Sequence, residues 1–368
     1  MRIGIIGAGQ LGQMLGFAAR DLGDECRFVD PAESPPAAAC GDVIRRPFDD
    51  DEALAELAAT CDVVTYEFEN VPVGALARIE SEVPIYPPPD ALRHSQDRLE
   101  EKRLFEALGI PLPGYLAIDS REDLAHAADA LGLPFVVKTR RFGYDGKGQF
   151  VVRETEQIDA AWEAIGSQPL IAEQWVPFDY EVSCIGARNV AGDVAMYPLS
   201  RNVHEGGILR TSASPVDAPQ IAGQAEDFVR RLLARLDYVG VLALELFVCG
   251  NALQANEFAP RVHNSGHWTI EGSATSQFEN HIRAITNRPL GSTASRGHAG
   301  MINLIGTIPS AARTLATGVL HDYGKAPRPG RKLGHITVTA GSAAERDRLT
   351  ASIRRNLTES APGSGTAS

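Results

Sequence analysis

The sequence has few cysteines, no long hydrophobic run and no strongly basic stretch, and each absence excludes a class of protein. Its 5 cysteines among 368 residues include no Cys-x-x-Cys pair, which excludes a disulfide scaffold and is typical of thiols in a reducing compartment. No segment approaches the roughly 20 apolar residues that a membrane span requires. Glutamines and glycines interrupt the uncharged stretch at 3–19, which argues against a signal peptide. We therefore expect a cytoplasmic protein without a membrane partner.

Positive charge is scarce in this chain. It has 35 Lys and Arg residues against 47 Asp and Glu residues, a formal net charge of −12, and no Lys/Arg run longer than two. Nucleic acids are bound through basic faces, so no nucleic-acid partner is expected. With 44% apolar and 22% charged residues, the composition excludes a disordered or collagen-like chain. At roughly 100–200 residues per domain, the length suggests two or three domains.

The first 85 residues or so have the pattern of an α/β sheet. A short apolar strand at 2–6 is followed by a glycine turn and an amphipathic helix, and further strands are expected at 26–30 and 62–70. Three consecutive prolines at 87–89 predict a boundary. A helix is expected from Ser95, as its N-cap, to Leu108.

Two further groups of strands follow residue 111. Short strands at 134–139, 148–152 and 170–176 predict a small α+β lobe. A larger sheet is expected from strand-like runs at 181–187, 193–199, 240–248 and 251–259, beside an amphipathic helix at 221–236. A helical run around Arg346 closes the globule, and the tail after it lacks apolar periodicity, which predicts disorder.

The hexapeptide GAGQLG at 7–12 fits the pattern G-x-G-x-x-G between a strand and a helix. Asp30 ends the next strand, 18 residues after the last of these glycines. Together they form a complete dinucleotide fingerprint, which favours NAD binding. The alternative is that the glycines only allow close approach of strand and helix, with another anion or nothing at the helix N-terminus. These residues alone leave both interpretations open.

A second glycine-rich loop, at 140–149, carries three glycines in six residues. Lys147 lies within it and Lys138 on the strand before it. Glycines let backbone N–H groups close over phosphates, and the two ammonium groups offset phosphate charge. The pattern predicts a nucleotide lid, although a plain hairpin could use glycines in the same way.

Two glutamates, Glu245 and Glu257, lie on neighbouring strand-like runs. If the chain turns at 249–251, the two carboxylates can meet on one face of a hairpin. Mg²⁺ prefers a few hard oxygen ligands together with phosphate oxygens. A solvated acidic face is the alternative, which the apolar neighbours of each glutamate disfavour. A dense polar run follows, which would be costly beside a core strand unless it is used: Asn256, Arg261, His263, Asn264, Ser265 and His267.

Two charged clusters surround other glycine turns. One, at 201–212, contains Arg201, His204, Glu205 and Arg210; the other, at 324–335, contains Lys325, Arg328, Arg331, Lys332 and His335. The second is the most basic stretch of the chain. It is either a surface loop or a site for a negatively charged small substrate. The histidines lack zinc-ligand spacing.

Five motifs in this order resemble the ATP-grasp superfamily and, within it, the N5-carboxyaminoimidazole ribonucleotide synthetase family: TYEFEN, KTRRFGYDGKGQ, RNVHEGGIL, NEFAPRVHNSGHWTIE and YGKAPRPGRKLGHIT. The resemblance runs from Met1 to about residue 340. It implies an α/β and α+β fold with a Rossmann-like N-terminal domain, a two-lobed ATP-grasp centre and a small C-terminal domain. The implied segments are 1–110, 111–177, 178–295 and 296–357, followed by a disordered tail at 358–368.

The resemblance also implies an activity. Members of this family carboxylate 5-aminoimidazole ribonucleotide with bicarbonate, through carboxyphosphate, in de novo purine biosynthesis, using ATP and Mg²⁺. It further implies a homodimer and a glycine turn at 7–12 that holds no NAD. The alternatives are another ATP-grasp ligase, such as a formate-dependent glycinamide ribonucleotide transformylase, a nucleotide-binding regulator without turnover, and an NAD-dependent oxidoreductase.

Roles for the ATP site follow from the same resemblance. Arg98 and Lys138 should lie near the ATP phosphates, covered by the loop of Gly143, Tyr144, Asp145, Gly146, Lys147, Gly148 and Gln149. The adenine should meet the backbone of Glu173, Gln174, Trp175 and Val176. Glu181 should bind the ribose, and His204 falls in a segment that contacts the nucleotide.

The remaining implied roles concern the metal and the other substrates. Glu245 and Glu257 should carry Mg²⁺, with Asn256 beside them. Arg261 and His263 should face the bicarbonate and the amine, and Lys325 and Arg331 should hold the ribonucleotide 5′-phosphate. Two residues depart from the family pattern: Gln13 stands where relatives commonly carry Arg, and Val262 replaces a common Pro.

Overall fold

The computed structural model describes residues 1–143 and 148–359. Its N-terminal part is a parallel sheet in the order β3-β2-β1-β4, as the apolar runs predict. The strands are β1 (Arg2–Ile6), β2 (Glu25–Val29), β3 (Asp42–Ile44) and β4 (Val63–Tyr66). The helical segments are α1 (Gln10–Asp21), η1 (Pro36–Ala39), α2 (Asp51–Thr60) and α3 (Val73–Leu76).

The predicted helix from Ser95 is wrong at its start, because two helices lie there. Helix α4 (Pro89–Ser95) ends at Ser95, and α5 (Arg98–Ala107) begins after Asp97. The Asp97 side chain accepts hydrogen bonds from the first turn of α5, which makes it the N-cap. Pro89, the last of the three consecutive prolines, is the first residue of α4. Proline fits the first turn of a helix, where its missing N–H has no intrahelical partner.

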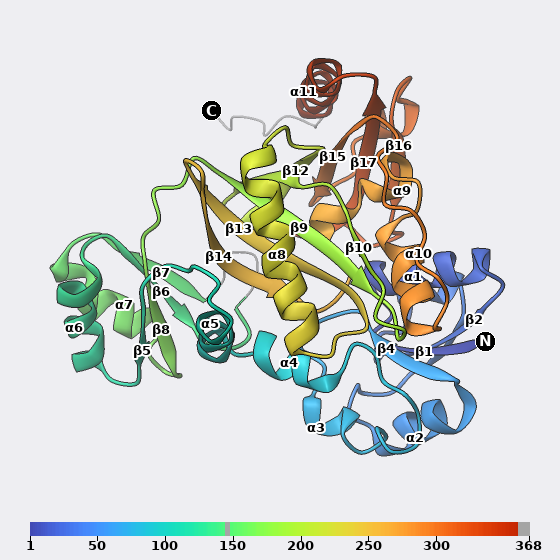
Figure 1. Ribbon diagram of the computed structural model, residues 1–368, viewed down its shortest axis with the longest axis horizontal. Coiled ribbons are helices and arrows are strands. Elements are labelled where there is room, and N and C mark those ends of the chain that lie inside the picture. The colour runs from blue at the N-terminus through green and yellow to red at the C-terminus, as the bar shows by residue number, and fades with distance from the viewer. Residues whose placement is uncertain (144–147, 360–368) are drawn as a thin grey trace, which may run out of the picture.

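A small lobe follows, at the left of Figure 1. Its antiparallel sheet has the order β5-β8-β6-β7. The strands are β5 (Tyr115–Ile118), β6 (Phe135–Thr139), β7 (Gln149–Val152) and β8 (Leu170–Gln174). Its helical segments are α6 (Arg121–Leu131), η2 (Thr155–Gln157) and α7 (Ile158–Ile165). Strands β6 and β7 flank the glycine loop, as predicted.

A nine-stranded sheet forms the centre of the described chain, in the order β14-β13-β9-β11-β12-β15-β17-β16, with β10 paired to β9. Its first strands are β9 (Tyr180–Arg188), β10 (Val194–Met196), β11 (Ser200–Glu205), β12 (Ile208–Ser214), β13 (Gly240–Cys249) and β14 (Ala252–Ala259). The C-terminal segment adds β15 (His298–Ile305), β16 (Val319–Asp322) and β17 (Lys332–Ala340). Because β15 pairs with β12, this segment extends the large sheet. The division of the chain at the expected residue numbers stays a prediction.

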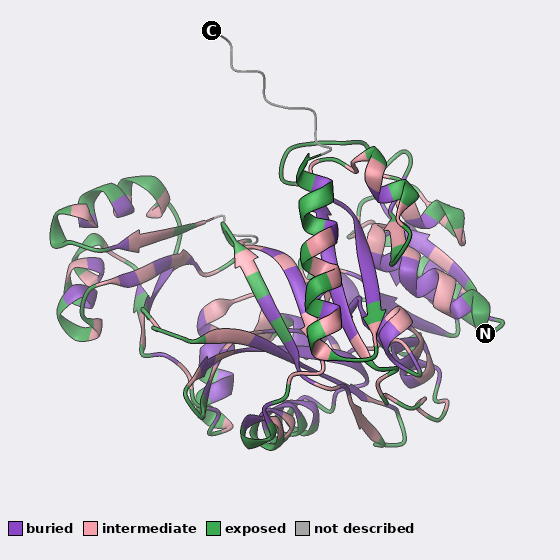
Figure 2. Ribbon diagram, turned by 90° about the horizontal axis from the view of Figure 1, so that it is seen from above, coloured by how far each residue is buried: buried purple, intermediate pink, exposed green. Residues whose placement is uncertain are grey.

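Helix α8 (Pro219–Arg235) covers one face of this sheet, in front of β9 and β13 in Figure 1. Its predicted apolar stripe is buried, including Ile221, Phe228 and Leu232. Burying a side chain of this size contributes about 1.5–3 kcal/mol. In Figure 2 buried residues concentrate in strands at the middle of the molecule, and exposed residues lie mainly on the outer helices and loops.

Other helices pack around the same sheet. They are η3 (Asn264–Gly266), α9 (Thr269–Gly272), α10 (Gln277–Ile285), η4 (Ser310–Thr314) and α11 (Ala343–Glu359). Helix α10 contacts both α1 and β13, so it joins the N-terminal part to the large sheet. Among the residues described, no helix is long and apolar enough to cross a membrane.

Candidate active site

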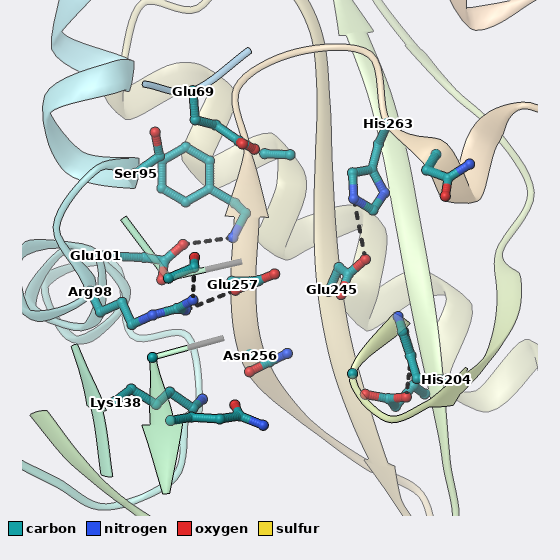
Figure 3. A pocket seen from close by; sticks show the side chains of 18 of the residues that line it. Glu69, Ser95, Arg98, Glu101, Lys138, His204, Glu245, Asn256, Glu257 and His263 are labelled. Atoms are coloured by element: carbon teal, nitrogen blue, oxygen red, sulfur yellow. Dashed lines mark hydrogen bonds and ion pairs between the residues drawn. The ribbon is translucent and has the colours of Figure 1, made fainter. Parts of the chain in front are cut away.

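A cavity of about 540 Å³ lies where the N-terminal sheet, the small lobe and the large sheet meet. Most of its lining side chains are polar or charged, and Figure 3 shows them converging from several elements. The lining includes Gln10, Glu69, Arg98, Glu101, Lys138, Glu181, His204, Glu245, Asn256, Glu257, Arg261, His263, His267 and Lys332. It also includes Gly143, Gly148, Gln149 and Trp175. One cavity therefore brings together most of the residues that the sequence singles out.

The two glutamates of the β13–β14 hairpin lie directly opposite each other. Glu245 pairs with Glu257 in the strand register, beside a bulge at the next residue. The chain turns between Cys249 and Ala252, so the predicted hairpin is confirmed. Burial and the charge of Glu257 raise the pKa of Glu245 to about 8. Burial acts the same way on Glu257, but Arg98, together with Lys138 and Lys102, more than offsets it and lowers the pKa of that carboxyl.

This donor set fits a divalent cation. Two facing carboxylates repel each other, and a cation between them would relieve that repulsion. In the described residues, no group of three or more His, Cys, Asp or Glu side chains could hold a metal ion. An ion at Glu245 and Glu257 would thus need further oxygens, such as those of a triphosphate. Their role as Mg²⁺ ligands stays a prediction.

Arg98 and Lys138 approach the cavity from α5 and β6, and both are paired with carboxylates. Arg98 donates from Nη1 to Glu257 Oε2 at 2.9 Å and from Nη2 to the Gly143 carbonyl at 3.2 Å. Lys138 Nζ donates to Glu173 Oε2 at 2.8 Å. These cations lie beside the glutamate pair, as Figure 3 shows, and could approach phosphates bound there.

The residues expected to bind adenine have different surroundings in the structure. The side chain of Glu173 is buried among cations rather than exposed to the cavity. The Gln174 N–H donates to the Gly114 carbonyl at 2.8 Å, so this donor is already used within the small lobe. Trp175 lines the cavity, and Val176 follows it beyond the end of β8. The adenine contact of these backbones stays a prediction.

Two histidines contact carboxylates within the cavity. His204 Nδ1 lies 2.6 Å from Glu181 Oε2, so two residues expected near the nucleotide are paired. Burial lowers the pKa of His204, but Glu181 and Glu245 outweigh this and raise it. His263 Nε2 lies 3.4 Å from Glu245 Oε1. Burial and Arg261 lower the pKa of His263 well below its ordinary value, so its ring is neutral at pH 7.

Arg261 is held by a residue that sequence reasoning missed. Its Nη2 lies 2.6 Å from Glu69 Oε1, and its Nη1 donates to the Val262 carbonyl at 2.9 Å. Glu69 belongs to the TYEFEN motif, and its place just after β4 was the signal that could have identified it. The ion pair fixes the guanidinium at the wall of the cavity.

Other missed residues are the buried Lys102 and an aromatic pair. Lys102 Nζ donates to the Asn256 carbonyl at 2.5 Å and lies 3.7 Å from Glu173 Oε2. Phe178 and Phe247 stack at the cavity wall, with ring centroids 4.8 Å apart. Spacing along the chain gives no signal for either, because each arrangement joins two distant segments.

The basic C-terminal cluster reaches the cavity through a different residue from the two predicted. Lys332 lines the cavity, whereas Lys325 and Arg331 do not. Lys325 Nζ donates to Gln10 Oε1, and Arg331 Nη1 donates to the Ala326 carbonyl at 3.2 Å. The phosphate role of Lys325 and Arg331 stays a prediction.

Other predicted residues have simpler outcomes. Asp30 accepts hydrogen bonds from the Ala8 and Ala32 N–H groups, each at 2.8 Å, so its carboxylate is used within the N-terminal sheet. The predictions for Tyr144, Asp145, Gly146 and Lys147 lie outside the described residues, as does most of the tail predicted to be disordered.

Three family models match consecutive segments of the chain. They are the ribonucleotide synthetase preATP-grasp domain at residues 1–96, the ATP-grasp domain at 103–278, and the phosphoribosylaminoimidazole carboxylase C-terminal domain at 299–348. These matches confirm the predicted fold class.

Relatives match along nearly the whole chain. The N5-carboxyaminoimidazole ribonucleotide synthase of Pseudomonas aeruginosa is 49% identical over 346 residues, covering 94% of this chain and 96% of that protein. The crystal structure of the synthetase from Thermus thermophilus is 48% identical with a TM-score of 0.92, covering 98% and 99% of the two chains. The Aspergillus clavatus enzyme, crystallised with ADP and 5-aminoimidazole ribonucleotide, is 32% identical with a TM-score of 0.90, covering 97% and 98%. The chain belongs to the N5-carboxyaminoimidazole ribonucleotide synthetase family of ATP-grasp ligases.

Proposed function

We propose that this enzyme carboxylates 5-aminoimidazole ribonucleotide with bicarbonate and ATP, yielding N5-carboxyaminoimidazole ribonucleotide, ADP and phosphate in purine biosynthesis. The observation that carries the proposal is the single cavity in which the facing glutamates, Arg261, His263 and the paired cations Arg98 and Lys138 meet. The relatives named for this reaction, one of them crystallised with ADP and the ribonucleotide, support it.

The ATP phosphates would bind beside Arg98 and Lys138, which now contact carboxylates of the chain. Mg²⁺, held by Glu245 and Glu257, would offset charge on the transferring phosphoryl group. In phosphoryl transfer, positioning and electrostatic stabilisation supply most of the acceleration. Gly143 and Gly148, which belong to the predicted lid and flank residues 144–147, line the same cavity.

Bicarbonate is a poor electrophile, so it must be activated before the amine can attack. Phosphorylation by ATP converts it to carboxyphosphate, and the carbon then bonds to the exocyclic amine as phosphate leaves. Arg261, fixed by Glu69, would stabilise the negative charge of carboxyphosphate. His263, whose ring is unprotonated and lines the same cavity, would accept the proton that the amine loses.

The ribonucleotide phosphate would bind at the basic segment, with Lys325 and Arg331 as predicted contacts and Lys332 nearest the cavity. We also propose a cytoplasmic location, which the scattered cysteines of the sequence predict. We also propose a homodimer, implied by the family resemblance. Light scattering checks it against the 39.4 kDa mass of one chain.

The deciding experiment measures ADP release with each substrate omitted in turn. We expect release only when ATP·Mg²⁺, bicarbonate and 5-aminoimidazole ribonucleotide are all present. Turnover with formate and glycinamide ribonucleotide would instead indicate the transformylase reaction. Micromolar NAD binding in calorimetry, without ATP binding, would exclude the ligase proposal.

A further inference from the structure

The glycine turn at residues 7–12 holds a carboxylate from the chain itself. Glu67, only 7% exposed, accepts hydrogen bonds from the N–H groups of Gly9 and Gly12, each at 2.5 Å. Gly9 precedes α1 and has no side chain to cap it. The N-terminus of a helix favours an anion. Glu67 therefore lies where a dinucleotide fingerprint would hold a phosphate.

The spacing of the glycines matches this internal carboxylate. A Cβ atom at Gly7 would lie 2.4 Å from Glu67 Cγ, and one at Gly9 would lie 2.6 Å from Glu67 Oε1. A Cβ at Gly12 would lie 2.9 Å from the Gly7 carbonyl. Only glycine allows these approaches. The close-approach interpretation of the motif thus accounts for all three glycines without a dinucleotide.

Gln10 lies between the two anchored N–H groups and lines the active-site cavity. Its Oε1 accepts a hydrogen bond from Nζ of Lys325, which follows β16 near the other end of the chain. The start of α1 is therefore a contact between the N-terminal part and the basic segment. The backbone position of Gln10 depends on hydrogen bonds to Glu67 on both sides of it.

Glu67 and Lys325 also interact electrostatically. Burial and the neighbouring Arg331 lower the pKa of Lys325 to about 8, and Lys332 and Arg328 act in the same direction. Glu67 opposes them, because its negative charge favours protonated Lys325. A neutral residue at position 67 would therefore lower the pKa of Lys325 further. It would also weaken the hydrogen bonds that anchor the glycine turn.

We propose that Glu67 is a positioning residue for the ribonucleotide: it anchors the glycine turn, and through Gln10 it holds Lys325 for the substrate phosphate. The inference rests on the proposed function, because that function assigns Lys325 to the phosphate. ATP binding should not depend on this arrangement, since its expected cations lie on α5 and β6.

The test is Glu67→Gln, which keeps the size of the side chain but turns an amide donor toward one of the two N–H groups. We expect the KM for 5-aminoimidazole ribonucleotide to rise about tenfold, the effect of losing one hydrogen bond to a charged group. The KM for ATP should change less than about twofold. In a Lys325→Ala background, adding Glu67→Gln should change neither KM by more than about twofold, because the coupling is already lost.

Asp50→Ala is the matched control. Asp50 caps α2, which packs beside the N-terminal sheet, by accepting a hydrogen bond from the Ala53 N–H at 2.9 Å. Its loss should lower the melting temperature without changing either KM. Gln10→Ala is a second variant that leaves Glu67 in place, and it should also raise the ribonucleotide KM alone.

The outcomes separate the inference from the function on which it rests. If Glu67→Gln only lowers the melting temperature, as Asp50→Ala does, or raises both KM values alike, Glu67 is a structural cap and the inference is overturned. Unchanged kinetics in both Glu67→Gln and Gln10→Ala would overturn it too. Wild-type enzyme without ribonucleotide-dependent ADP release would overturn the proposed function, and the inference with it.

Discussion

Replacing Lys102 tests how much a buried ion pair between the lobes contributes to the free energy of unfolding. Its side chain is 1% exposed, and it contacts the Asn256 carbonyl on β14 and Glu173 on β8. Lys102→Met keeps most of the apolar stem but removes the charge. Glu173, itself 4% exposed, would then retain Lys138 as its ion-pair partner among the described residues.

Two independent arguments give the expected decrease in the free energy of unfolding. Breaking a buried ion pair by removing one partner costs about 3–5 kcal/mol. Independently, burial would raise the pKa of Glu173, but Lys102, Lys138 and Arg98 lower it to about 2, against an ordinary value of 4.5. At about 1.4 kcal/mol per pKa unit, ionised Glu173 stabilises the folded state by about 3 kcal/mol. Since Lys102 is one of three cations, we expect Lys102→Met to cost about 2–4 kcal/mol.

The pH dependence of this stabilisation follows from the same pKa. The pKa of Glu173 is lowered in the folded state, so its stabilisation is complete above about pH 4.5 and is lost as the pH falls toward 2. The difference between wild type and Lys102→Met should therefore be constant from pH 5 to 8 and shrink in acid.

The assay is urea unfolding at pH 7, followed by circular dichroism and tryptophan fluorescence. Arg103→Met is the control, because Arg103 pairs with Glu100 at 2.7 Å on the exposed side of the same helix. A surface pair of this kind contributes about 0–1 kcal/mol. If both variants lose equally little stability, below about 1 kcal/mol, the reasoning about buried charge is refuted.

Three further predictions concern the chemistry. Glu257→Gln should lower kcat by about 10² to 10⁴ at saturating Mg²⁺ with an unchanged circular dichroism spectrum, because a metal ligand is lost; an unchanged kcat would remove Glu257 from the site. Arg331→Ala should raise the KM for the ribonucleotide about 10- to 100-fold and leave the KM for ATP unchanged, as substrate-varied kinetics will show. The pKa of Lys325 is about 8, so the ribonucleotide KM should rise above pH 8 as the ammonium loses its proton. Lys325→Arg should abolish that rise, because arginine stays charged.

Local pattern was sufficient to predict the carboxylate hairpin. The alternation of apolar residues gave two strands, and Gly250 and Asn251 are turn formers, so pairing of the strands followed. The exact partner did not, because an unbroken register would place Glu245 opposite Asn256, and the bulge between Glu245 and Leu246 brings it opposite Glu257 instead. The buried stripe of α8 followed from its period for the same reason. Both depend on residues close in the sequence.

The start of α5 could not be predicted in the same way. Ser95 and Asp97 are both good N-cap residues, and propensity does not choose between them. The Arg98 N–H donates to the Arg140 carbonyl on the small lobe, a contact that fixes where the helix begins. Tertiary contact also buried Lys102, although lysine is ordinarily a surface residue of helices.

The acidic composition has a consequence for binding that no single motif shows. Cations expected to meet ATP and bicarbonate each have a carboxylate partner of the chain: Arg98 has Glu257, Lys138 has Glu173, and Arg261 has Glu69. These partners reduce the repulsion among the clustered cations of the cavity. A phosphate that binds there must therefore compete with, or share, an existing ion pair, so its affinity is a difference between two sets of contacts. Removing Glu69 or Glu173, which are partners of a cation and not proposed metal ligands, can accordingly tighten anion binding while it destabilises the fold.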